Sequence, residues 1–250
     1  MRPKLKIVVP TYNTENWIVR CLDSIYKQSY KNFECIIIND ASTDSTKLKI
    51  DAYLESIQDN RFFVIHNTYN KKALRNIVEG FNWIKADKDP ECVLMAIDGD
   101  DFLYSEMSLE IIAQVYDRFN PLLTYGNWVG WPFGGGSNNK PIPDLVHKMK
   151  NYRELPFAFS HLRTFKSKLW YNIDQNDLKD KDGKFYEVGW DVSFMLPMIE
   201  MAQERAIMIP NILYCYNRIN PISDDKIRQQ EQIAVDNEIR KKKPYERFVE

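Results

Sequence analysis

Short apolar runs alternate with polar segments along the first hundred residues of the chain. Four runs of four to six residues are rich in Ile, Val or Phe, which is typical of strands buried on both faces of a sheet. They span residues 5–9, 33–38, 62–65 and 93–97. Between them, residues 15–28, 45–57 and 74–84 repeat apolar positions at helical spacing. The order β-α-β-α-β-α-β predicts an α/β fold with a mostly parallel, Rossmann-like sheet and helices on both faces.

The pattern changes after residue 101. Elements are predicted at 108–119 (helix), 122–125 (strand), 128–140 (loop), 191–204 (helix), 212–216 (strand) and 223–243 (charged helix). The loop combines aromatic residues with a glycine run, which fits either a mobile cover over a pocket or a solvent loop without function. Pro197 is expected to kink its helix or to start a second part of it.

Composition and charge restrict the partners. The formal net charge is −1, from 34 basic and 35 acidic residues, so no global field would attract nucleic acid, and we expect no such partner. Hydrophobic residues make up 44% of the chain, which is enough for a full core. The four cysteines lie among apolar neighbours without metal-ligand spacing, and we expect buried free thiols.

No segment resembles a membrane anchor. The apolar run near the start is too short for a signal peptide, and no stretch approaches the roughly 18 apolar residues of a transmembrane helix. We therefore expect no transmembrane segment and a cytoplasmic location. The basic run 240–243 is interpreted as a helix end beside its own carbonyls, with peripheral contact to a membrane face left open.

Polar residues follow three of the predicted strands. The strand ends carry Thr11 and Asn13, then Asp40, then an acidic turn at 98–101. Ligands bind at the carboxyl ends of strands in open α/β sheets, so these side chains are expected to converge on one crevice. The alternative is that polar residues at these strand ends only cap helices. Thr11, Asn13 or Thr14 could cap the first helix, and Ser42 or Asp44 could cap the second.

The acidic turn indicates a cation site. Asp98, Asp100 and Asp101 place three carboxylates within four residues, and Mg²⁺ or Mn²⁺ takes such hard oxygen ligands. Gly99 allows the backbone to approach a ligand closely. The alternative is a solvated acidic turn without a ligand.

The sequence resembles family 2 glycosyltransferases with the GT-A fold, including bacterial and viral members. The resemblance rests on residues 7–13, 36–44 and 98–101, and continues through 160–166, 189–191 and 213–221. It covers about residues 4–222. The turn at 98–101 matches the DXD motif of this family.

The resemblance implies roles for particular residues. It assigns the donor nucleotide to Pro10, Thr11, Asn13, Asp40, Arg75, Asp98 and Gly99. Asp40 would hold the base, often uracil, and Asp100 the metal that bridges the diphosphate. The assignment of Arg75 departs from the family pattern, because Asn70-Lys71-Lys72 replaces the usual glycine-containing approach, and Lys72 is an alternative. The role of Asp101 stays open.

The second half must supply a base for the acceptor hydroxyl. The resemblance favours Asp191, which could otherwise be a helix cap, and Glu187 is the next candidate. His161 is a candidate contact to metal, phosphate or acceptor. Trp131, Trp190 and Tyr186 could stack on a sugar, although core packing is the expected role of at least one of them.

Together these features predict an inverting glycosyltransferase that moves a sugar from a nucleotide-diphosphate donor, UDP-linked by expectation, to a hydroxyl of a glycan or lipid-linked acceptor. Residues 1–101 would form the donor half, 102–222 the acceptor and catalytic half, and 223–250 a helical tail outside the donor site. Two alternatives remain: a non-catalytic nucleotide- or glycan-binding module of this fold, and a sugar nucleotidyltransferase, which would need a glycine-rich basic loop after the first strand. The sugar, the linkage and the oligomeric state, including a homo-oligomer, are open.

Overall fold

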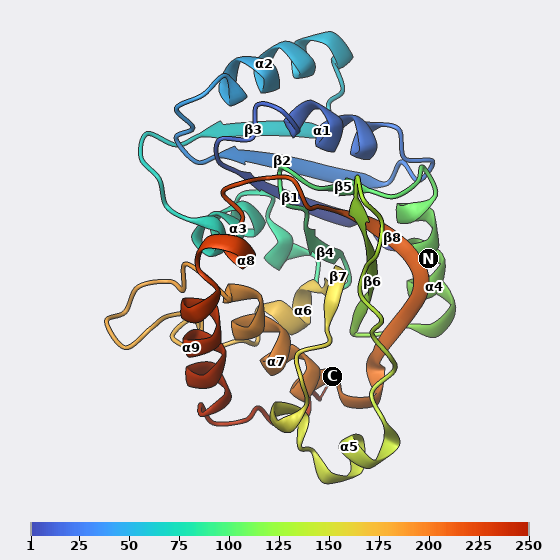
Figure 1. The fold of residues 1–250 in the computed structure, drawn as a ribbon. Helices are drawn as coiled ribbons and strands as arrows, with labels where there is room; N and C mark the ends of the chain where they lie inside the picture. The colour runs from blue at the N-terminus through green and yellow to red at the C-terminus, as the bar shows by residue number, and fades with distance from the viewer. Residues whose placement is uncertain (1, 250) are drawn as a thin grey trace.

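A mixed eight-stranded sheet forms the centre of the computed structural model, which describes residues 2–249 (Figure 1). Its strand order is β3-β2-β1-β4-β7-β6-β8-β5. The first four strands are parallel to one another: β1 (Leu5–Thr11), β2 (Phe33–Asn39), β3 (Phe62–His66) and β4 (Val93–Ala96). Leu5 pairs with Phe33 on one side and with Val93 on the other, so the three strands start together and their carboxyl ends share one edge.

The second half of the sheet contains two strands of reversed direction, β7 and β5. β7 (Ser160–Lys166) is antiparallel to both β4 and β6 (Leu123–Trp131). β8 (Ala206–Asn217) is parallel to β6, and the short β5 (Phe102–Leu103) is antiparallel to β8. The predicted mostly parallel sheet is confirmed, and the sequence pattern missed β7 and β5 as strands.

Two apolar cores lie on opposite faces of the sheet. On β1, Ile7 and Val9 contribute to the core under α1 (Ile18–Tyr26), α2 (Thr46–Ile57) and α4 (Ser108–Phe119). Val8 contributes to the core under α3 (Ala73–Trp83), α6 (Ser167–Trp170) and α7 (Trp190–Ala202). This alternation follows from the two-residue period of a strand, and it confirms the predicted helices on both faces (Figure 1).

Helix α7 is buried on all sides: every residue from Val192 to Ala202 is inaccessible to solvent or nearly so. Pro197 lies inside this helix, which continues on both sides of it. A helix that is apolar all round needs cover on every face. Part of that cover is the C-terminal segment, α8 (Asp224–Ile227) and α9 (Gln229–Arg240), since α9 contacts α7.

The C-terminal segment is fastened to the core by buried polar contacts. Arg153 forms an ion pair with Glu200 at 2.5 Å and donates hydrogen bonds to the carbonyls of Ile239 and Lys242. The basic run is partly turned inward: Arg240 donates to the carbonyl of Arg153, and Lys242 donates to the carbonyl of Asp177. These two cations serve internal contacts, so the run is not simply a helix end beside its own carbonyls.

The smaller elements complete the fold. They are α5 (Asp144–Met149) and the 3-10 turns η1 (Ala86–Lys88), η2 (Tyr152–Glu154) and η3 (Gln203–Arg205). The predicted loop 128–140 is wrong in its first part, because Trp128–Trp131 is the end of β6, and Gly136 bridges back to Val129. The four cysteines are buried free thiols, as expected. No helix within residues 2–249 is both long and apolar enough to span a membrane.

Candidate active site

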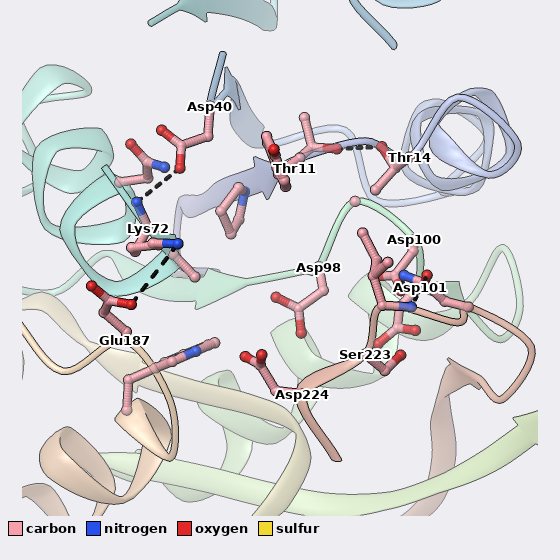
Figure 2. Close-up of a pocket in the computed structure, with 18 of the residues that line it drawn as sticks. Thr11, Thr14, Asp40, Lys72, Asp98, Asp100, Asp101, Glu187, Ser223 and Asp224 are labelled. Carbon is pink, nitrogen blue, oxygen red and sulfur yellow. Dashed lines mark hydrogen bonds and ion pairs between the residues drawn. The ribbon is translucent and has the colours of Figure 1, made fainter. Parts of the chain in front are cut away.

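A pocket of about 630 Å³ opens at the carboxyl ends of β1, β2 and β4 (Figure 2). Its opposite wall comes from β7, the start of α7 and the C-terminal segment. Most of the residues singled out in the sequence line it: Pro10, Thr11, Asn13, Asp40, Asp98, Gly99, Asp100, His161, Glu187, Trp190 and Asp191. Side chains that are far apart in the chain therefore share one crevice, as the strand-end pattern predicts.

Three predicted residues lie away from the pocket lining: Arg75, Trp131 and Tyr186. Arg75 is directed along its own helix, where its Nε donates to Glu79 at 2.9 Å, while Lys72 lines the pocket. Trp131 packs edge-on against Phe102, with the guanidinium of Arg20 4.4 Å from its ring. Of the two basic candidates, the structure therefore brings Lys72 rather than Arg75 to the site. Tyr186 is a core residue that donates to Glu238.

The loop after β1 is held by side chains of the loop after β2. Asn13 adopts a left-handed backbone with φ of 52°, and its Oδ1 accepts the N–H of Thr43 at 2.9 Å. The hydroxyl of Thr11 hydrogen-bonds that of Thr14. Asp44 behaves as the capping alternative predicts. Its carboxylate accepts the N–H of Thr46, the first residue of α2, and also the N–H of Glu15. Asn13 thus orders the pocket rim whether or not it also touches a ligand.

Asp40 is buried and anchors the turn that leads into α3. Its Oδ1 accepts the N–H of Lys71 and the amide of Asn67, and its Oδ2 accepts the N–H of Lys72. A carboxylate offers about four lone-pair positions, so one position on Oδ2 stays available. The contact with two backbone amides also means that this residue supports the local fold.

The acidic turn places its three aspartates differently. Loss of hydration at the pocket floor, and then the charge of Asp100, raise the pKa of Asp98 to about 7. Asp100 accepts the amide of Asn220 at 2.6 Å. Asp101 is buried, and burial followed by the charges of its two neighbours raises its pKa well above the ordinary value. Its Oδ1 accepts the N–H of Asn217 at 2.7 Å, which ties the acidic turn to the end of β8.

Gly99 allows β1 and the acidic turn to come into contact. An added Cβ at this position would overlap the side chain of Thr11. The sequence assigned this glycine to close approach of a ligand, and the structure adds a close approach between two loops of the pocket.

The start of α7 carries a connected group of charged and aromatic side chains. Arg163 Nη2 donates to Asp191 Oδ2 at 2.5 Å, and Arg163 Nη1 lies 2.9 Å from His161 Nε2. The imidazole stacks on Tyr214 with ring centroids 4.5 Å apart. Loss of hydration, and then the charge of Arg163, hold the pKa of His161 well below its ordinary value. Asp191 and His161, both predicted site residues, are thus linked through Arg163, to which the sequence assigned no role.

The C-terminal segment lines the pocket, so the prediction that residues 223–250 lie outside the site is wrong. Figure 2 shows Asp224 pointing toward Asp98 across the pocket. Arg228 Nη1 lies 3.4 Å from Glu187 Oε2, and Lys72 Nζ lies 3.9 Å from the same oxygen. The segment carries no motif, and its place follows from packing against α7, which a search for strand-end motifs does not detect.

The donor set fits a divalent cation only in part. Within residues 2–249, no three His, Cys, Asp or Glu side chains are grouped so as to hold a metal ion by themselves. Asp98 and Asp100 are nevertheless two neighbouring, half-buried oxygen donors in the pocket lining, where their mutual repulsion favours a shared cation. Mg²⁺-type sites commonly combine one or two carboxylates with substrate phosphates and waters, and this arrangement fits such a site.

Comparison with known proteins gives one family. A model of glycosyl transferase family 2 matches residues 6–179. Glycosyltransferase GlyG of Streptococcus pneumoniae is 29% identical over 137 residues, covering 55% of this chain and 43% of that protein. The uncharacterized glycosyltransferase EpsJ of Bacillus subtilis is 28% identical over 239 residues, covering 89% and 63%. The chain thus spans less than two thirds of the length of either relative.

Solved structures share the fold. Mannosyltransferase PcManGT from Pyrobaculum calidifontis, in complex with GDP-Man and Mn²⁺, matches with a TM-score of 0.65 and 20% identity, over 98% of this chain and 66% of that chain. The 1–349 fragment of S. aureus TarS in complex with UDP-GlcNAc matches with a TM-score of 0.59 and 17% identity, over 93% and 66%. The expected GT-A type fold is confirmed. Because the family model matches most of the sequence, the chain belongs to glycosyl transferase family 2.

Proposed function

We propose that this protein transfers a sugar from a nucleotide-diphosphate donor, with uridine as the nucleoside, to a hydroxyl group of a glycan or lipid-linked acceptor. The observation that carries the proposal is the convergence of Asp40, Asp98 and Asp191 on one pocket, from opposite halves of the sheet. Two proteins of the same fold were solved with UDP-GlcNAc and with GDP-Man, which supports a nucleotide-sugar donor.

The donor base would lie beside Asp40. The available position on Oδ2 suits a single N–H donor, and uracil presents one such group on its pairing edge. Residues 1–101 would then form the donor half and 102–222 the acceptor half, with the C-terminal segment closing the pocket beside both.

Asp98 and Asp100 would hold a divalent cation, Mn²⁺ or Mg²⁺, together with the donor diphosphate. When bound, the cation supplies positive charge next to a leaving group that becomes more negative. A protein of the same fold that was solved in complex with GDP-Man and Mn²⁺ supports this assignment.

Asp191 would act as the general base. Its carboxylate lies at the first turn of α7 and in the lining of the pocket. The acceptor hydroxyl gives its proton to Asp191 as its oxygen bonds to the anomeric carbon. The carbon–oxygen bond to the diphosphate breaks, and its electron pair leaves with the diphosphate. A single displacement of this kind inverts the anomeric centre.

The substitution Asp191→Asn tests the base. We expect transfer to fall by about 10²–10⁴, with nucleotide binding unchanged, because the amide keeps the shape but takes no proton. Asp144→Asn, at the first turn of α5 and outside the pocket, is the matched control and should keep full activity. Transfer at the wild-type rate by Asp191→Asn, or retention of the anomer by NMR of the first product, would reject this base and make Glu187 the next residue to test.

The nucleotide is tested by thermal shift with UDP, GDP, CDP and ADP in the presence of Mn²⁺. A specific nucleotide stabilises the fold by about 2.7 kcal/mol at a hundredfold excess over its Kd. UDP is expected to give the largest shift. A larger shift with GDP would replace uridine by guanosine in the proposal, and no shift with any nucleotide would contradict a donor site in this pocket.

A further inference from the structure

We propose that Arg163 is a positioning residue for the base: it holds the Asp191 carboxylate in one orientation, and His161 acts through Arg163 by fixing its guanidinium. This inference rests on the proposed role of Asp191. The two residues, His161 and Arg163, lie on β7 and contact each other. Neither belongs to the strand-end motifs.

The guanidinium of Arg163 is constrained at three of its nitrogens. Nε donates to the carbonyl of Phe159 at 2.9 Å, Nη1 faces His161 at 2.9 Å, and Nη2 donates to Asp191 at 2.5 Å. The Arg163 side chain is only 10% exposed, so water competes little for these donors. A planar guanidinium held at three corners presents Nη2 in a fixed direction.

His161 is suited to act as the acceptor in this arrangement. Arginine has only donors, so the contact from Nη1 requires an unprotonated Nε2 on the imidazole. The low pKa of His161 agrees with a neutral ring, and the stack on Tyr214 fixes the plane of that ring. The chain of contacts therefore runs from Tyr214 through His161 and Arg163 to the base.

The Asp191 carboxylate is oriented by contacts on both oxygens. Oδ2 accepts from Arg163, and Oδ1 accepts the N–H of Val192 at 3.1 Å. Each oxygen keeps a further lone pair, and the side chain is 23% exposed, toward the pocket that it lines. Positioning matters because a displacement of about 1 Å in a reacting group can cost on the order of 10² in rate.

The test compares Arg163→Met and Arg163→Lys with the control Arg118→Met, which removes an exposed arginine on α4, outside the pocket lining. The readout is kcat for transfer at saturating donor, acceptor and Mn²⁺, with the donor KM measured alongside. For Arg163→Met we expect kcat to fall by about 10² with a much smaller change in donor KM, because the base is displaced while the donor contacts stay in place.

Arg163→Lys keeps the charge but not the planar fork. It should recover only part of kcat, because a lysine ammonium is not held by His161 and Phe159 as the guanidinium is. A wild-type kcat in folded Arg163→Met, a rise in donor KM as large as the fall in kcat, or a wild-type kcat in the Lys variant would overturn the proposal. The variant Asp191→Asn tests the base separately: if it is fully active the base itself is wrong, whereas an inactive Asp191→Asn beside a fully active Arg163→Met rejects only the role of Arg163.

His161→Phe provides a second route that leaves Arg163 in place. Phenylalanine can still stack on Tyr214 but offers no acceptor to Nη1. We expect kcat to fall, by less than in Arg163→Met, with the donor KM close to its wild-type value. A wild-type kcat in this variant would overturn the role given to His161, including in the case where Arg163→Met fails to fold.

Discussion

Asp40 shows how one side chain can serve both the fold and a ligand. It accepts N–H groups from Lys71 and Lys72 at the entry to α3, and it is buried within the pocket lining. Removing the carboxylate therefore leaves two backbone donors without their partner, in addition to any effect on the nucleotide.

We expect Asp40→Ala to weaken UDP binding and to lower the free energy of unfolding by about 1–2 kcal/mol, the range for losing a cap-type contact. Calorimetry and urea unfolding measure the two effects separately. Asp51→Ala, which removes a partly exposed carboxylate on α2 outside the pocket, should leave UDP binding intact. A UDP affinity equal to wild type in Asp40→Ala would remove this residue from the site.

His161 gives a prediction on pH. Its pKa is lowered in the folded protein, first by desolvation and then by Arg163. The unfolded chain takes up this proton near pH 6.5, while the folded chain resists it, so the contribution of His161 to stability is full above about pH 6.5 and is lost as the pH falls below it. NMR of the ring nitrogens should show a neutral imidazole from pH 8 to about pH 6. A midpoint within that range would contradict the neutral acceptor.

At the scale of elements, the C-terminal segment is an integral part of the domain. Ile239 is 1% exposed, and the Arg153–Glu200 pair beneath the segment is almost fully buried. Truncation after residue 223 is therefore expected to destabilise the fold, in contrast to the expectation from composition alone.

We expect Arg153→Met to lower the free energy of unfolding by about 3–5 kcal/mol, because it leaves the Glu200 charge buried without its partner. The matched control is Arg247→Met, which breaks a pair with Glu204 in which both side chains are 55% exposed. That change should cost less than about 1 kcal/mol. Similar losses for the two variants in urea unfolding would show that the segment is only loosely attached.

The elements that the sequence predicted well are those whose signal is local. Strands β1, β2 and β4 are short segments dominated by apolar residues, and the helix Ser108–Phe119 has the predicted bounds. β7 was missed because Ser160–Lys166 mixes polar and apolar residues, and its polar side chains are satisfied by partners distant in the chain.

The residues of the candidate site likewise divide into those with a local sequence signal and those placed by tertiary packing. Asp40, Asp98 and Asp191 follow recognisable strand-end or helix-start patterns and line the pocket. Asp224 and Arg228 reach the pocket only because α9 packs against α7 and α8 packs against α9. Their positions depend on tertiary packing, which no local pattern in a single sequence encodes.

At the scale of the whole molecule, three segments of the chain enclose one pocket: the parallel strand ends, the start of α7 with β7, and the C-terminal segment (Figures 1 and 2). The two carboxylates at the floor and the facing Asp224 concentrate negative charge there. A donor diphosphate would add to that charge, so binding is expected to require a divalent cation.

The most direct test of metal-assisted transfer is the rate of UDP release from a panel of UDP-sugars, measured with Mn²⁺, with excess EDTA, and in the variant Asp100→Ala. We expect at least one UDP-sugar to be turned over with Mn²⁺, and release to be lost both in EDTA and in Asp100→Ala while that variant stays folded. Release at the full rate in EDTA, or an unchanged rate in Asp100→Ala, would contradict metal-assisted transfer in this pocket.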